Sequence, residues 1–82
     1  MVWVVTGGTK GLGRSLVMAL VNEGHTVVAM GRDSAALAEL HDGERVHAVH
    51  LDLADPAGVA EAAAEVLALP PVLEHGVTGL LH

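Results

Sequence analysis

Residues 2–14 read VWVVTGGTKGLGR, and this stretch decides the fold. A continuously apolar run, Val2–Val5, leads into four glycines within seven residues, which are Gly7, Gly8, Gly11 and Gly13. Such a run is typical of a parallel-sheet strand that is buried on both faces. Glycines between a strand and a helix let backbone N–H groups approach an anion closely. The stretch therefore predicts a strand, a phosphate-binding turn and the start of a helix.

The remainder of the chain continues the alternation of strands and helices. Apolar positions of the first helix repeat at helical spacing, at Leu12, Leu16, Val17, Leu20 and Val21. Gly24 would end that helix, and the residues that follow predict strands at 26–30, 46–51 and 77–81 and helices at 34–40 and 57–69. Asp33 or Ser34 would cap the second helix, and Asp55 the third. This order predicts an α/β fold, a Rossmann-type doubly wound parallel sheet, of which residues 1–82 form the N-terminal β-α-β-α-β-α-β portion.

The composition limits which side chains can form the core and which kinds of partner the protein can bind. The chain has 82 residues, is 51% hydrophobic and carries a formal net charge of −6. Because it lacks Cys, Tyr and Phe, a disulfide scaffold is excluded and the core must be aliphatic. The acidic balance argues against nucleic-acid partners, and no apolar run reaches the roughly 20 residues that span a bilayer. With no basic segment ahead of residues 1–5, a secretory signal is also not expected. We therefore expect a cytoplasmic protein that does not bind membranes.

Six histidines raise the question of a metal site. His47 and His50 are three apart in a predicted strand, so their side chains point to opposite faces. His25, His41 and His75 are predicted in solvated loops. No metal site is therefore predicted.

Three phosphate-binding patterns compete for the glycine-rich turn. The pattern G-x-G-x-x-G fails, because residues 11–13 are not followed by a third glycine. Residues 8–15 meet the P-loop pattern except that Arg14 replaces the phosphate-binding lysine, so a P-loop-like nucleotide binder stays an alternative. A turn that needs glycine only for its shape is the structural alternative. The pattern T-G-x-x-x-G-x-G is met in full, by Thr6, Gly7, Gly11 and Gly13.

With this last pattern the sequence resembles the short-chain dehydrogenase/reductase family, in its single-domain branch. The resemblance extends over essentially the whole chain: residues 31–33 read GRD after the second predicted strand, residues 52–53 read DL after the third, and residues 79–82 resemble the strand before the family's Asn-Ala-Gly segment. It implies that residues 1–82 are an NADP(H)-binding half-domain of an oxidoreductase. Such an enzyme transfers hydride between NADP(H) and a small-molecule carbonyl or alcohol substrate, and full-length relatives are usually homo-oligomers.

The resemblance also implies roles for residues around the pyrophosphate and the ribose. Backbone groups of four residues would line the pyrophosphate, namely Gly7, Gly11, Leu12 and Gly13. The hydroxyl of Thr9 would lie near the adenosine ribose.

At the adenine, Asp52 would accept a hydrogen bond from the amino group and the Leu53 backbone would contact the ring. The structural alternative for Asp52 is a residue that stabilises the following turn.

The charges near the second strand favour NADP(H) over NAD(H). An NAD site needs a carboxylate at the end of this strand, whereas an NADP site needs a cation for the 2′-phosphate. The predicted strand ends at Gly31 with Arg32 next, and Lys10 and Arg14 lie in the glycine turn. Asp33 has nearly the spacing of an NAD-type acid but suits a helix N-cap better. The resemblance agrees, since basic residues at the Lys10 and Arg32 positions mark the NADP-preferring members.

The catalytic set of the family, a Tyr with a Lys four residues later and an assisting Ser and Asn, is absent. The chain has no tyrosine, its one lysine is Lys10, and its one asparagine is Asn22 on the first predicted helix. No catalytic residue is therefore predicted, and the sequence is expected to be the N-terminal part of a longer enzyme. A non-catalytic NADP(H)-binding or sensing module is the alternative.

Overall fold

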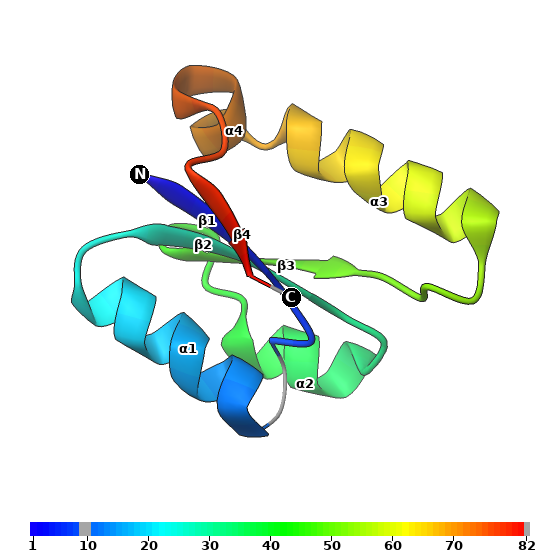
Figure 1. Ribbon diagram of the computed structural model, residues 1–82, viewed down its shortest axis with the longest axis horizontal. Coiled ribbons are helices and arrows are strands. Elements are labelled where there is room, and N and C mark those ends of the chain that lie inside the picture. Colours follow the sequence, from blue (N-terminus) through cyan, green and yellow to red (C-terminus); the bar gives the residue numbers. More distant parts are fainter. Residues whose placement is uncertain (9–10, 82) are drawn as a thin grey trace.

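The computed structural model describes residues 1–8 and 11–81, which form one parallel sheet between two layers of helices (Figure 1). The strands are β1 (Val2–Thr6), β2 (Thr26–Gly31), β3 (Val46–His50) and β4 (Gly79–Leu81). The helices are α1 (Gly11–Asn22), α2 (Ser34–Leu40), α3 (Pro56–Ala68) and α4 (Pro70–His75). Helices α1 and α2 cover one face of the sheet, and α3 and α4 cover the other (Figure 1). The predicted α/β fold is confirmed.

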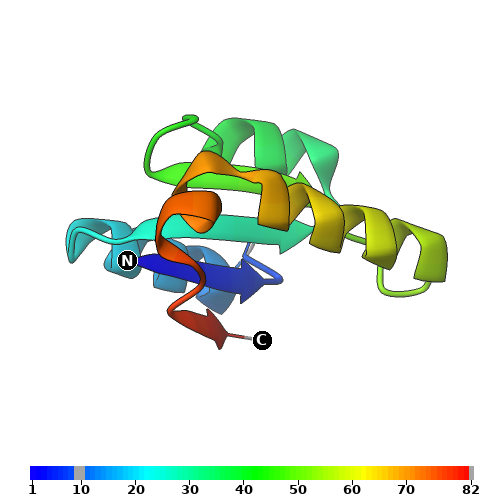
Figure 2. The same cartoon turned by 90° about the horizontal axis from the view of Figure 1, so that it is seen from above.

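The strand order is β3-β2-β1-β4, and every neighbouring pair is parallel, as Figure 2 shows from above. The chain runs outward from β1 to β3 with α1 and α2 on one face, and then crosses back to β4 with α3 and α4 on the other. Right-handed crossovers require this change of face when the direction of travel reverses. The strand order therefore reverses between β1 and β4. In open α/β sheets, ligands bind at the carboxyl ends of the strands near such a point.

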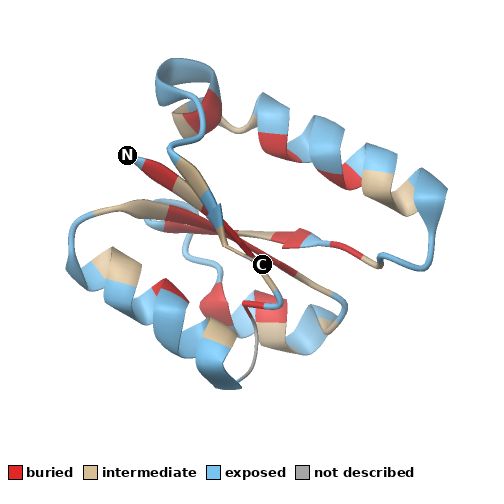
Figure 3. Ribbon diagram, in the orientation of Figure 1, coloured by how far each residue is buried: buried red, intermediate tan, exposed pale blue. Residues whose placement is uncertain are grey.

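The core consists of two aliphatic halves, one on each face of the sheet (Figure 3). Under α3 and α4 lie Val2, Val4, Val28, Met30, Val49, Leu51, Ala62, Val66 and Val72. On the opposite face lie Val5, Val17, Val27, Ala29, Leu40 and Val46. Neighbouring residues of a strand fall in different halves because successive side chains point to opposite faces. The prediction of an aliphatic core, mainly valine, leucine and alanine, is confirmed.

The apolar stripe predicted for α1 is wrong at its start. Val17 is fully buried and Leu20 packs against the core, whereas Leu12 is 78% exposed and Leu16 is at the limit of exposure. The inward face of α1 begins instead at Gly13, one helical turn before Val17. The lack of a side chain at Gly13 lets the helix start directly against the glycine turn.

The three residues predicted to mark helix ends stand at those ends. Asp33 is the N-cap of α2, and its Oδ1 accepts a hydrogen bond from the Ala36 N–H at 3.1 Å. Gly24, after α1, has the positive φ of 88° that favours glycine. Asp55 is the N-cap of α3 and Pro56 its first residue, as predicted, but the Asp55 side chain makes no capping hydrogen bond.

The segment after α3 also differs from the prediction. Pro70 and Pro71 end α3 as expected, but they also begin α4, which the sequence interpretation missed. Proline is tolerated in the first turn of a helix because the N–H groups of that turn have no helical partner. His75 therefore ends a helix rather than lying in a loop, and β4 begins at Gly79 rather than at residue 77.

Candidate functional site

A groove of about 660 Å³ lies across the carboxyl ends of β1, β2 and β3. We call it the strand-end groove, and its lining is Thr6, Gly7, Met30, Gly31, Arg32, Asp33, Leu51, Asp52, Leu53 and Ala54. Its volume falls within the range of about 300–1,000 Å³ that is usual for small-molecule sites. The apolar part of the lining comes from the buried Met30 and Leu51 together with Leu53 and Ala54. Strand ends, a mainly apolar lining and a few charged side chains are what a nucleotide site requires.

The groove brings together four of the residues predicted to bind the cofactor, which are Gly7, Arg32, Asp52 and Leu53. Gly11, Leu12 and Gly13 are not part of its lining and form the first turn of α1. Thr9 and Lys10 lie outside the described residues. Sequence reasoning missed Met30 and Leu51, because the last apolar residue of a strand looks the same whether it lines a groove or fills the core.

The turn after β1 is held by the neighbouring strand. Gly7 has a φ of 70°, which glycine adopts readily. The N–H groups of Gly7 and Gly8 both donate to the Met30 carbonyl oxygen, at 2.8 and 3.3 Å. The Gly7 N–H is therefore engaged within the fold, and the amides left to face an anion are those of the first turn of α1.

The first turn of α1 is packed directly against this glycine turn. A Cβ on Gly13 would overlap the Gly7 carbonyl oxygen and would lie 2.9 Å from the Gly7 carbonyl carbon and 3.1 Å from the Gly8 Cα. Gly11 has a φ of 53°, and a Cβ there would meet open space. The first N–H groups of a helix have no intrahelical partner and carry partial positive charge. The first turn of α1 contains no acidic residue, so it can hold an anionic group.

The described arginines make different contacts. Arg32 is exposed and lines the strand-end groove. Arg14, in the first turn of α1, places its Nη1 3.7 Å from Glu39 Oε2 on α2. Arg45 donates from Nη1 to the Gly24 carbonyl oxygen at 2.9 Å, at the opposite ends of the strands. Among the described residues, Arg32 is therefore the cation that faces the groove.

Both carboxylates of the groove also serve the local fold. Asp52 Oδ1 accepts a hydrogen bond from the Ala54 N–H at 3.0 Å, which is the turn-stabilising role weighed as its structural alternative. Asp33 Oδ1 is used by the cap of α2. A carboxylate has about four lone-pair positions, so Asp52 can accept a further bond while it keeps the turn.

Over residues 1–8 and 11–81, no three His, Asp or Glu side chains gather in a way that could hold a metal ion. In the same part of the chain, none of the helices has both the length and the apolar character that crossing a bilayer demands.

Comparison with known proteins places the chain in a family. The family model described as short chain dehydrogenase matches residues 1–73. The NADP-dependent 3-hydroxy acid dehydrogenase YdfG of Escherichia coli strain K12 is 34% identical over 68 residues, covering 80% of this chain and 27% of that protein.

Two solved structures are similar over almost the whole chain. Serine dehydrogenase from Escherichia coli aligns with a TM-score of 0.79 and 30% identity, covering 98% of this chain and 36% of that one. The closed form of serine dehydrogenase complexed with NADP+ aligns with a TM-score of 0.76 and 33% identity, covering 98% and 32%. The chain thus spans about a third of these structures and about a quarter of the YdfG protein. The match over residues 1–73, the parallel sheet and the glycine turn together show that this chain belongs to the short-chain dehydrogenase/reductase family.

Proposed function

We propose that this chain binds NADP(H) along the strand-end groove and the first turn of α1, as the cofactor-binding part of a short-chain dehydrogenase/reductase. The observation that carries the proposal is the meeting of the groove, the Arg32 side chain and the glycine turn at one edge of the sheet. The cofactor would supply or accept the hydride. The substrate class proposed for the whole enzyme is a small carbonyl compound or the corresponding alcohol.

Each part of the cofactor has a matching group on the chain. The amides of Gly11, Leu12 and Gly13 would bind the pyrophosphate, because they are unpaired within the helix and stand at the positive end of its dipole. Glycine at position 13 keeps this turn close to Gly7, so that the anion can approach the backbone. The Gly7 N–H already donates to the Met30 carbonyl oxygen. Gly7 would therefore help only because it has no side chain, which lets the pyrophosphate approach the backbone.

At the adenosine end, Asp52 would accept the adenine amino group and the Leu53 backbone would contact the ring, since both line the groove. Thr9 and Lys10 keep their proposed roles near the adenosine ribose and the 2′-phosphate.

The choice of NADP(H) over NAD(H) is supported by the end of β2. Gly31 offers no carboxylate to the ribose, Asp33 is used by the cap of α2, and Arg32 provides the cation that a 2′-phosphate requires. YdfG is named as NADP-dependent, and a similar serine dehydrogenase was solved with NADP+.

A binding titration of Arg32→Asp tests this proposal. We expect the native protein to bind NADPH more tightly than NADH, with binding followed by nicotinamide fluorescence. Arg32→Asp replaces a charge-assisted contact by repulsion, so NADPH affinity should fall about tenfold or more while NADH affinity holds or improves. Arg45→Asp makes the same change of charge at the opposite strand ends and should leave the preference intact.

Two results would contradict the proposal. An unchanged preference in Arg32→Asp would show that this arginine does not contact the 2′-phosphate. Binding of magnesium–ATP without binding of either nicotinamide dinucleotide would instead favour the P-loop-like alternative for the glycine turn.

A further inference from the structure

The outer edge of β3 forms one border of the sheet (Figure 2). Just before this strand the Arg45 carbonyl oxygen accepts from the Val27 N–H at 2.7 Å, and just after it the Leu51 N–H donates to the Gly31 carbonyl oxygen at 2.8 Å. Backbone groups alternate between the two sides of a strand, so the odd-numbered residues bond to β2 and the even-numbered residues direct their N–H and C=O groups outward. A row of outward groups is a template on which a further strand can pair.

The sequence of β3 contains none of the residues that commonly protect a border strand. Residues 46–51 read VHAVHL, without Lys, Arg, Asp, Glu or Pro. Charged side chains and proline are the usual means by which a border strand resists pairing with another chain. Any protection of this edge must therefore come from another segment.

The turn that precedes β3 covers the outward groups of its first residue. The Val46 N–H donates to Asp42 Oδ1 at 2.9 Å. The Val46 carbonyl oxygen accepts from the N–H groups of Asp42 and Gly43, at 3.1 and 3.2 Å. Both outward groups of Val46 are therefore occupied by residues 42–43.

The next outward N–H of β3 is occupied by a side chain. The Ala48 N–H donates to Nδ1 of His41 at 3.0 Å. His41 is the C-cap of α2, where its own N–H donates to the Leu37 carbonyl oxygen at 3.0 Å. Its ring also meets the ring of the buried His47 edge-on, with centroids 6.1 Å apart. The His41 ring is thus held against the middle of the β3 edge by α2 and by β3.

Stabilisation of the turn alone does not account for His41. Asp42 Oδ1 already closes the turn with bonds from the N–H groups of Glu44, Arg45 and Val46. The bond from Ala48 lies beyond the turn, in the strand, and its effect there is to remove a free donor from the edge.

We infer that His41, Asp42 and Gly43, which we call the edge turn, close the β3 border to a further strand, and that His41 closes its middle. The strand excluded is β3 of a second copy of this chain. Two copies of one edge can pair antiparallel about a two-fold axis, because such an interface joins the same surface of both subunits. This inference does not rest on the proposed cofactor site.

The first experiment measures amide hydrogen exchange by NMR in the native protein, His41→Ala and His41→Asn. In His41→Ala the Ala48 amide should exchange about three- to tenfold faster, as expected for loss of one neutral hydrogen bond. The Leu51 amide, bonded to Gly31 on β2, should not change and is the internal reference. His41→Asn keeps a side-chain acceptor and should retain most of the protection.

The second experiment measures self-association by sedimentation velocity over a concentration series. In a two-fold pair His41→Ala frees the Ala48 amide of both copies, so this variant should associate at concentrations about tenfold or more below those of the native protein. His41→Ala combined with Ala48→Pro removes the freed donor and should return association to the native level. Proline is tolerated in a border strand where its nitrogen faces outward.

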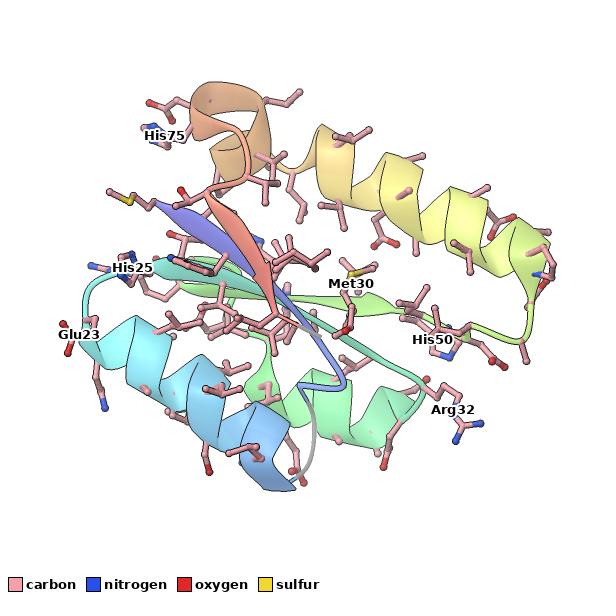
Figure 4. The ribbon with its side chains drawn as sticks, in the orientation of Figure 1. Glu23, His25, Met30, Arg32, His50 and His75 are labelled. Atoms are coloured by element: carbon pink, nitrogen blue, oxygen red, sulfur yellow. The ribbon has the colours of Figure 1, made fainter. Side chains whose placement is uncertain are left out.

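His75→Ala is the matched control for removal of an exposed histidine. His75 ends α4, and Figure 4 shows it on the side of the sheet away from α2. This variant should associate as the native protein does. Because the chain has no cysteine, a spin label on His50→Cys reports whether two β3 edges meet. Pairs of labels should come close in the His41→Ala background and not in the native background.

Three results would overturn the inference. Unchanged exchange of the Ala48 amide in His41→Ala would show that the ring does not protect it. Faster exchange without increased association would show that the edge turn is not needed to exclude a second copy. Increased association that leaves the labels far apart, or that Ala48→Pro does not reverse, would place the contact on another surface. Far-UV circular dichroism establishes that each variant is folded.

Discussion

At the scale of single residues, Gly13 matters both for the packing of α1 and for the proposed binding site. The space for its side chain is taken by the backbone of Gly7 and Gly8, so α1 starts in direct contact with the turn that follows β1. Gly11 is different, because its requirement for glycine comes from a positive φ of 53° and not from a neighbour. Gly11 and Gly13 are therefore required for different physical reasons, a difference that the sequence pattern alone does not reveal.

Gly13→Ala should destabilise the protein and weaken NADPH binding. The added methyl group meets backbone atoms that cannot rotate away, and forced overpacking of this kind costs about 1–3 kcal/mol. Urea unfolding followed by circular dichroism measures the stability, and an NADPH titration measures the binding.

Gly58→Ala is the control for this change. A Cβ on Gly58 would lie 3.0 Å from Asp55 Oδ2, a side-chain atom that makes no capping bond and can move. Alanine inside a helix is favoured over glycine by about 1 kcal/mol, so this variant should be as stable as the native protein or more so. Equal stability of both variants would contradict the close contact at Gly13.

At the scale of elements, β3 is preceded by a turn that depends on one carboxylate. Asp42 Oδ1 accepts hydrogen bonds from the N–H groups of Val46, Glu44 and Arg45, at 2.9, 2.8 and 2.8 Å. The bond from Val46 and then that from Glu44 lower the pKa of Asp42 below its ordinary value of 3.8, while desolvation opposes them and the Arg45 bond adds a smaller lowering effect. The turn positions the start of β3, whose far end carries His50 and leads to Asp52.

The stability contributed by Asp42 should be lost in acid. A carboxyl group with a lowered folded pKa stabilises the protein fully above its unfolded pKa, near 3.8, and loses this effect as the pH falls through the folded value. Asp42→Asn keeps an acceptor oxygen but cannot be protonated in this range. Its free energy of unfolding should therefore decline less than that of the native protein between about pH 5 and pH 2.

Urea unfolding at a series of pH values measures this difference, with Glu44→Gln as the control for removal of a nearby carboxylate. Asp42→Ala, which deletes the acceptor, should cost about 1 kcal/mol at neutral pH, as loss of a capping side chain does. Parallel pH curves for the native protein and Asp42→Asn would show that the turn does not depend on the charge.

At the scale of the whole molecule, the sheet joins residues that are far apart in the sequence. β4 pairs with β1, so that Trp3 is the register partner of Gly79. The Trp3 ring lies over Gly79, where a Cβ would fall 2.7 Å from Cε3 and 2.8 Å from Cη2. The one aromatic side chain of the protein thus covers a glycine on the edge strand.

Gly79→Ala should displace Trp3 and weaken the pairing of β1 with β4. We expect a loss of about 1–3 kcal/mol, as for other overpacked contacts, and a change in Trp3 emission in the folded state. Thr78→Ala is the control, because Thr78 is exposed and contributes its backbone N–H to the Val2 carbonyl oxygen, which alanine retains. An unchanged emission spectrum and stability in Gly79→Ala would contradict the packing of the ring on this glycine.

Much of the fold could be predicted because its strands, helices and helix caps depend on the properties of short sequence segments. Apolar runs of β-branched residues, Gly24 with its positive φ, and Asp33 as a cap follow from the preferences of short segments, and all are confirmed. Helix α4 was missed because two prolines can end one helix and begin the next with the same residues. The family and the glycine pattern were also readable from the sequence, whereas the cofactor roles of the individual residues stay predictions.

By itself the sequence determined the alternation of strands and helices, the aliphatic core and the glycine turn, because each depends on neighbours a few residues away. Only the tertiary structure decided that Arg14 pairs with Glu39 and that Leu12 is exposed. It also decided that His50 stands level with Gly31. The physical reason is that strand register and helix rotation are set by packing between distant segments, and a shift of one residue would send each side chain of a strand to the other face.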